Sequence, residues 1–209
     1  MKKMSNKGFT LIELLAVITI MGILMMVAIP SVSRTIENSR RDTFADNVRT
    51  YINAVRNAAL ADEILCYDVN HTTDKVVYSS TPDGNYYFKI CTDDLTVDGT
   101  AKCSSQNTKD MMETVAKSSW GNAELYGVVS WNKSNSKATY TAAFVDASGH
   151  GMKEVVKELD VKRGAIYTTD AIKKNDIFSI TYYGAWIKSG ASIVKPTDTS
   201  KYFQCEYAQ

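Results

Sequence analysis

The sequence predicts an α+β fold, in which one long N-terminal helix packs against an antiparallel β-sheet. Three observations lead to this expectation. Leu14–Ile29 is a continuous apolar run, apolar residues then recur at helical spacing as far as Ala59, and short β-rich segments separated by turns follow from Tyr67. We divide the chain into a basic leader (1–8), a hydrophobic helix (9–30), an amphipathic helix (31–66) and a β-rich globular head (67–209).

The overall composition is that of an ordinary globular protein. Of the 209 residues, 44% are hydrophobic and 22% are charged, and the formal net charge is only +1. A charge so close to zero gives no strong case for nucleic-acid binding. Residues 67–209 contain no low-complexity linker and no internal repeat, so a single head domain is expected.

The apolar run is long enough to cross a membrane. Its only polar side chain is Thr19, and a helix over Phe9–Ile29 would be about 31 Å long, close to the ~30 Å hydrocarbon core of a bilayer. Basic residues before the run predict that the N-terminus stays in the cytoplasm and that the chain after Pro30 is exported. These residues are Lys2, Lys3 and Lys7.

Glu13 is an acidic residue at the start of this apolar segment, where a charge is not expected. Inserting an unpaired carboxylate into hydrocarbon costs about 2.5–3.5 kcal/mol. Either the segment never enters a membrane, or Glu13 meets a partner, or its side chain reaches back to the membrane surface.

The leader differs from a secretory signal peptide. Such a signal has its small-residue cleavage site after the apolar stretch, whereas Gly8 comes before it and no A-x-A-like site follows at residues 29–33. Cleavage between Gly8 and Phe9 would remove the lysines and leave the membrane anchor on the mature chain.

The segment Lys7–Glu13, KGFTLIE, resembles the processing motif of type IV pilins and pseudopilins, and the resemblance extends over about residues 7–60. It implies a pilin fold. It also implies that a membrane peptidase cuts after Gly8 and that the same enzyme methylates the new N-terminus at Phe9. The head beyond about Cys66 carries no motif of this family.

The same resemblance gives Glu13 a partner. After cleavage the free amine of Phe9 lies one helical turn away, and the amine of a neighbouring subunit reaches Glu13 when helices stack with an axial offset. Removing one member of a buried ion pair typically costs about 3–5 kcal/mol, so this pairing would set the stagger between subunits. In filaments of some family members the segment corresponding to Gly22–Pro30 is unwound; the alternative is a continuous helix kinked at Pro30.

The second half of the predicted helix is apolar on one side only. From Phe44 to Ala59 the apolar residues are three or four positions apart, which is typical of an amphipathic helix with one face on a sheet. We expect one helix from Phe9 to about Leu65.

The head is expected to be an antiparallel sheet. Two β-rich segments are separated by the turn sequence Pro82–Asn85, and two more form a hairpin around Lys133–Lys137. Lys109–Lys117 is expected to be a short helix, and Lys153–Leu159 is ambiguous. The predicted strands are Lys75–Ser79, Tyr86–Ile90, Leu125–Asn132, Ala138–Asp146, Ile177–Ile187 and a shorter one near Ala165–Thr168.

The cysteines lie in the exported part of the chain, where disulfides can form, and four cysteines permit three pairings. Cys91 and Cys103 bracket a turn-rich loop, which favours a local bridge; Cys66 and Cys205 would then tie the C-terminal tail to the helix. Members of the resembled family often close the C-terminal part of the head with a disulfide, which does not fix the pairing. A zinc site is the alternative, but the sequence has no C-x-x-C and only two histidines.

The head shows no pattern typical of an enzyme. His71 and His150 lie in turn-like settings without a G-x-S-x-G, H-E-x-x-H or Walker motif. Asp93, Asp94 and Asp98 do not follow the spacing of a calcium loop. We therefore expect no enzyme activity, no metal and no cofactor.

The resemblance to type IV pilins implies a structural subunit of a type IV pilus-like surface filament, with a role in adhesion, motility or a related surface function. Its partners would be other pilin subunits in a helical homo-oligomer, the prepilin peptidase and pilus assembly machinery, and the membrane that it crosses once before assembly. After assembly it would be extracellular. The alternatives are a pseudopilin of a type II secretion or DNA-uptake system, and a minor pilin at the filament tip. A membrane-anchored enzyme or binding protein would need a nucleophile–base constellation, which the sequence does not offer.

Overall fold

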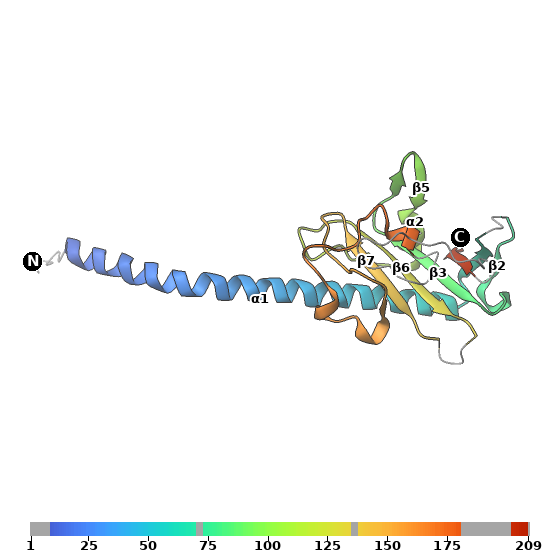
Figure 1. Ribbon diagram of the computed structural model, residues 1–209, viewed down its shortest axis with the longest axis horizontal. Helices are drawn as coiled ribbons and strands as arrows, with labels where there is room; N and C mark the ends of the chain where they lie inside the picture. The colour runs from blue at the N-terminus through green and yellow to red at the C-terminus, as the bar shows by residue number, and fades with distance from the viewer. Residues whose placement is uncertain (1–8, 70–72, 135–137, 181–201, 209) are drawn as a thin grey trace, which may run out of the picture. The chain divides into compact units, whose positions relative to one another are not determined.

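The computed structural model describes residues 9–69, 73–134, 138–180 and 202–208 (Figure 1). The fold is α+β, with a long N-terminal helix and a mostly antiparallel sheet, as the sequence predicts. The chain forms two compact units, residues 1–39 and 40–209. We describe each unit by itself.

The first unit contains the start of helix α1 (Leu11–Leu60). All side chains from Phe9 to Ile36 are exposed. By length and composition, this helix could cross a membrane. The helix continues on both sides of Pro30.

The second unit begins with the later part of α1, which buries one stripe of side chains. Phe44, Val48, Ile52, Val55 and Ala59 are all buried in the head core, so the predicted amphipathic pattern is confirmed. Burying side chains of this size typically stabilises a fold by about 1.5–3 kcal/mol each, which makes this stripe the main attachment of the helix.

Polar contacts fix the same part of α1 along its length. The guanidinium of Arg163 donates two hydrogen bonds to the Asp42 carboxylate, at 2.9 and 2.6 Å, and this contact holds the pKa of Asp42 below its ordinary value. The Asn47 side chain donates to the Lys117 carbonyl at 2.9 Å, and the Tyr51 hydroxyl donates to the Ala116 carbonyl at 2.5 Å.

The helix ends at Leu60, earlier than the predicted end near Leu65. Asp62 adopts a left-handed backbone with φ of 61°, and the next amide, of Glu63, donates to the Ala58 carbonyl at 3.0 Å. This is the hydrogen-bond pattern of a Schellman cap. The prediction of a helix to residue 66 is therefore wrong, because the cap reverses the chain and Ile64–Asp68 form strand β1.

In the described part of the chain, the main sheet has seven strands in the order β2-β1-β9-β3-β6-β7-β8. All neighbouring pairs are antiparallel except β3 and β9, which are parallel. Figure 1 shows β3, β6 and β7 side by side. The remaining strands of this sheet are β2 (Val76–Val77), β3 (Asn85–Cys91), β6 (Leu125–Asn132), β7 (Thr141–Asp146), β8 (Val156–Lys157) and β9 (Tyr202–Tyr207).

Smaller elements complete the head. A separate hairpin is formed by β4 (Leu95–Val97) and β5 (Thr100–Cys103). The short helices are α2 (Ser105–Met111) and α3 (Ile177–Ile180). Single-turn 3₁₀ helices cover Tyr78–Ser80, Glu158–Asp160 and Arg163–Ala165.

The sheet is buried on both faces. In β3, Phe88 and Ile90 belong to the core under α1, whereas Tyr87 and Cys91 belong to a second core on the opposite face. Gly127 of β6 is required by this packing, since a Cβ there would lie 2.3 Å from the ring of Phe144.

Three of the predicted strands are confirmed in place. Leu125–Asn132 matches β6, Tyr86–Ile90 lies within β3, and Ala138–Asp146 contains β7. The segment Lys75–Ser79 is a strand only at Val76–Val77, and then turns into a 3₁₀ helix.

Other predictions for the head are wrong. The strand predicted near Ala165–Thr168 is a 3₁₀ turn followed by one bridge between Tyr167 and Gly151. The helix expected at Lys109–Lys117 lies earlier, at Ser105–Met111, because Ser104 caps its start: the Ser104 hydroxyl accepts from the Gln106 amide.

The start of the predicted strand Ile177–Ile187 is also wrong. Residues 177–180 are helix α3, and the rest lies outside the described residues. Ile177 and Phe178 are both buried. A short continuous apolar run cannot be assigned to helix or strand by periodicity alone, which explains the error.

The structure joins Cys91 to Cys103 and Cys66 to Cys205, which is the pairing that the residues favoured. Cys66 and Cys205 lie directly opposite each other in β1 and β9. The second bridge therefore ties the C-terminal strand to β1, and not to the helix as expected.

Candidate functional site

The start of α1 is held by a reciprocal set of hydrogen bonds. The backbone amide and the hydroxyl of Thr10 each donate to a carboxylate oxygen of Glu13, both at 2.8 Å. The amide of Glu13 lies 3.4 Å from the Thr10 hydroxyl oxygen and donates to it. Threonine and glutamate three residues apart form a capping box, which satisfies amides that the first helical turn leaves without partners.

The capping box changes the interpretation of Glu13. In the single subunit its carboxylate accepts hydrogen bonds from its own chain, so the helix start gives it a partner before any neighbour is present. The spacing Thr10-x-x-Glu13 is visible in the sequence and is the signal that would have identified this role.

The other predicted N-terminal site residues are placed as follows. Phe9 is 92% exposed immediately before the helix. Gly22 lies inside α1 with open space where a Cβ would be, and Pro30 also lies inside it. Gly8 lies outside the described residues. The roles of these four residues in cleavage, methylation and unwinding remain predictions.

The exposed apolar surface of the first unit is not a stripe but covers every side of the helix. The four consecutive residues Ile23, Leu24, Met25 and Met26 point in directions about 100° apart around the axis, and each is more than half exposed. A helix that is hydrophobic all round needs either lipid or several partner helices around it. This surface is the main feature of the chain that calls for a partner.

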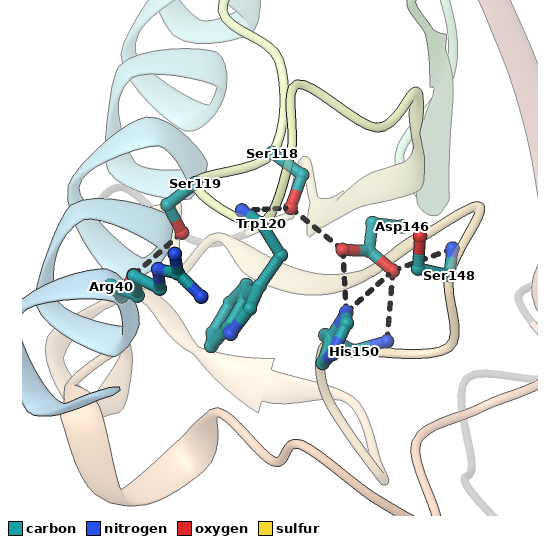
Figure 2. Close-up of polar contacts among 7 residues, drawn as sticks. All are labelled: Arg40, Ser118, Ser119, Trp120, Asp146, Ser148 and His150. Carbon is teal, nitrogen blue, oxygen red and sulfur yellow. Dashed lines mark hydrogen bonds and ion pairs between the residues drawn. The ribbon is translucent and has the colours of Figure 1, made fainter. Parts of the chain in front are cut away.

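Among the described residues of the second unit, the buried carboxylate is that of Asp146, at the end of β7 (Figure 2). It accepts hydrogen bonds from the Ser118 hydroxyl at 2.7 Å, the Ser148 amide at 2.9 Å and the His150 amide at 2.8 Å. The His150 ring nitrogen Nδ1 lies 2.9 Å from the same carboxylate. An ionised carboxylate only accepts, so Nδ1 is the protonated nitrogen.

Aromatic packing and one further hydrogen bond link this cluster to α1. The indole of Trp120 stacks on the His150 ring, with centroids 4.6 Å apart and planes at 7°, and packs against Phe44 at 5.8 Å. The Ser119 hydroxyl donates to the Arg40 carbonyl at 2.7 Å (Figure 2).

The Asp146 cluster contains the residue types of a hydrolase triad, but not its geometry. The Ser118 hydroxyl donates to Asp146, whereas a nucleophile would donate to the imidazole of His150. The cluster therefore fixes two loops against the start of the second unit. Among the described residues, no group of three or more His, Cys, Asp or Glu side chains could hold a metal ion. His71 lies outside that part of the chain.

Comparison with known proteins gives one match. The family model described as the prokaryotic N-terminal methylation motif matches residues 3–29. No curated protein and no solved structure matches the chain. The match covers the leader and the exposed apolar part of α1, and it does not extend into the second unit.

Proposed function

Residues 3–29 carry the signal of type IV prepilin-like proteins, a class III signal peptide, and from this premise we propose that the chain is a structural subunit of a type IV pilus-like surface filament. The motif supports a type IV pilin-like or pseudopilin protein. In the proposed pathway, prepilin peptidase cleaves after Gly8 and methylates Phe9, and the mature chain then enters the filament through its N-terminal helix.

The observation that carries this proposal is the exposed apolar helix in a chain with a methylation motif. Lipid covers the segment before assembly and neighbouring helices cover it afterwards. Lipid tails are as apolar as leucine, so exchanging them for helices gains little from the hydrophobic effect, and close packing must supply the attraction. A further, directional contact is then needed to fix one arrangement.

Glu13 is suited to supply that contact. In the single subunit its carboxylate is bound by neutral groups of Thr10. Cleavage after Gly8 creates a cationic amine at Phe9, and its positive charge attracts the carboxylate by a Coulomb interaction that the neutral groups of Thr10 do not provide. We propose that the amine of a neighbouring subunit takes over one of the Thr10 contacts and so sets the axial stagger.

The proposed partners follow from this pathway. They are other copies of the chain, the prepilin peptidase, the assembly machinery and the membrane that anchors the subunit before assembly. Loss of the three leader lysines lowers the formal net charge from +1 to −2, which gives no support to nucleic-acid binding. The methylation motif suggests a structural protein rather than an enzyme.

The location of the protein tests the proposal. An antibody raised against residues 40–209 is used for an immunoblot of material sheared from the cell surface. The same antibody, with gold labelling, is used to locate the protein on filaments by electron microscopy. The proposal predicts an abundant chain in the sheared fraction and labels along the filaments. A chain found only in membranes would contradict it in favour of a pseudopilin, and labels confined to filament ends would favour a minor tip pilin.

A further inference from the structure

Lys89 of β3 is a half-buried cation without an acidic partner in the described structure. It lies on the face of the sheet opposite α1. Its ammonium donates to the Lys102 carbonyl at 3.1 Å, and it lies 5.7 Å from the centroid of the Phe178 ring. No ion pair to Lys89 exists among the residues described. A desolvated charge of this kind is normally paired.

The acidic side chains that line the same cavity as Lys89 already have partners. Glu206, in the neighbouring strand β9, is paired with Lys75. Asp94, before β4, accepts from the Ser105 amide at 2.7 Å. Lys102 of β5 likewise has no ion pair in the described part of the chain. Two ammonium groups therefore share one region without a dedicated counter-ion.

These groups line one cavity of about 370 Å³, which is within the usual size range of small-molecule sites. Its neutral lining offers hydrogen bonds of both kinds. The Gln204 amide oxygen accepts from the Tyr87 hydroxyl at 3.1 Å, which leaves its NH₂ group as a donor. Thr96, Ser104 and Asn107 add further hydroxyl and amide groups, and Tyr67 adds an aromatic ring.

The electrostatics of the cavity favour an anion. Burial, with a smaller contribution from the nearby Lys102 ammonium, lowers the pKa of Lys89 to about 8. An anion bound beside Lys89 would stabilise its charged form and raise that pKa again. Asp94 and Glu206 also line the cavity, so a singly charged ligand meets less repulsion there than a doubly charged one.

We propose that this cavity binds a small polyhydroxylated carboxylate, with the carboxylate on Lys89 and Lys102 and the hydroxyl groups on Ser104, Asn107 and Gln204. The site lies entirely within the second unit. The proposed ligand site goes beyond the proposed role in a filament and does not depend on assembly. The two proposals can therefore be tested, and can fail, independently.

Isothermal titration calorimetry on the full chain in detergent micelles tests this site. Sodium glucuronate is the probe, and its uncharged methyl ester is the control that lacks the negative charge. We expect saturable glucuronate binding at pH 7 and at least tenfold weaker binding of the ester. Lys89→Met should weaken glucuronate binding at least tenfold and Lys102→Met several-fold. Lys153→Met, outside the cavity, should leave it unchanged. Affinity should fall several-fold between pH 7 and pH 9, because Lys89 loses its proton.

The assignment would be overturned by no saturable binding, by equal affinity for the acid and its ester, or by tighter binding of inorganic phosphate than of glucuronate. Lys102→Met provides a second variant if Lys89→Met unfolds, and thermal unfolding monitored by circular dichroism identifies that case. Unchanged binding by a folded Lys89→Met would also contradict the proposal.

Discussion

The carboxylate of Glu13 accepts two hydrogen bonds from Thr10, one from its backbone amide and one from its hydroxyl, each 2.8 Å long. Within a single subunit this carboxylate therefore caps a helix, and in the proposed filament it also pairs with a neighbour's amine. The two roles have different chemical requirements. Capping needs only an acceptor oxygen, whereas pairing needs a negative charge.

Glu13→Gln and Thr10→Ala separate these roles. Glutamine still accepts the capping hydrogen bonds but carries no charge, so Glu13→Gln should be processed normally and form few or no filaments. Thr10→Ala loses a cap worth about 0.5–2 kcal/mol but keeps the charge, so filament yield should fall much less. Filament counts in sheared fractions measure both. Wild-type filament numbers for Glu13→Gln, or a larger defect for Thr10→Ala, would contradict the pairing.

Gly22→Ala tests whether the segment from Gly22 to Pro30 unwinds on assembly. Alanine favours the helix by about 1 kcal/mol relative to glycine, and its Cβ meets open space in the single subunit. If the segment unwinds, this gain opposes assembly, and filament yield should fall. Ala28→Gly in the same segment reverses the change in helix propensity. The double variant Gly22→Ala/Ala28→Gly should therefore recover the filament yield of the wild type. Equal filament yields from the wild type, Gly22→Ala and the double variant would show that the segment stays helical.

The two disulfides should differ in their contribution to stability. Cys66–Cys205 closes a sequence separation of 139 residues and Cys91–Cys103 one of 12. Loop entropy then gives about 5 and about 3 kcal/mol, respectively. Paired Cys→Ser variants, compared by urea unfolding, should show the larger loss for Cys66 and Cys205. The reverse order would mean that loop entropy does not govern their effect.

Asp62 should contribute to the acid sensitivity of the fold. The amide and the hydroxyl of Ser79 donate to its carboxylate at 2.9 and 2.8 Å, and these bonds, with the Lys133 charge, lower its pKa below 3.8. A lowered folded-state pKa gives stability above the unfolded value, which is lost as the pH falls through the folded one.

Asp62→Asn should therefore reduce the loss of unfolding free energy as the pH falls below about 4, measured by urea titrations at each pH. Asparagine tolerates the left-handed backbone and can still accept from Ser79. Asp98→Asn is the matched control, because Asp98 is also left-handed and accepts no hydrogen bond in the described structure. An identical pH profile for Asp62→Asn and the wild type would rule out this contribution.

The elements that could be predicted from the sequence are those with local patterns. The stripe from Phe44 to Ala59 repeats every three or four residues, and Leu125–Asn132 is β-rich throughout, so both were placed correctly. The methylation motif is likewise contiguous, so residues 3–29 identify it without any structure.

The elements that were missed depend on distant partners. In strand β9 only Phe203 and Cys205 are buried, so its local apolar pattern is weak. The strand lies between β1 and β3, which are more than 100 residues away in the sequence. The Schellman cap has Asp62 at the left-handed position that glycine usually takes, and Ser79 stabilises it from outside the helix.

The candidate sites also fall into those with a local sequence pattern and those that depend on contacts between distant residues. Gly8, Phe9 and Glu13 follow one another in a short motif, whereas Ser118, Asp146 and His150 meet only because two loops close over the same end of the head. Lys89 is one polar residue in a β-rich segment, and Glu206 of the adjacent strand β9 is already paired with Lys75, which precedes β2.

Intact-mass and N-terminal analysis of the chain from sheared cell surfaces tests the central claim most directly. The account predicts a chain that lacks residues 1–8 and begins at N-methylated Phe9. In Gly8→Val, a branched side chain beside the scissile bond should leave the leader attached, whereas Gly164→Val, which meets open space in the head, should be processed normally. A full-length, unmethylated wild-type chain in that fraction would contradict the claim.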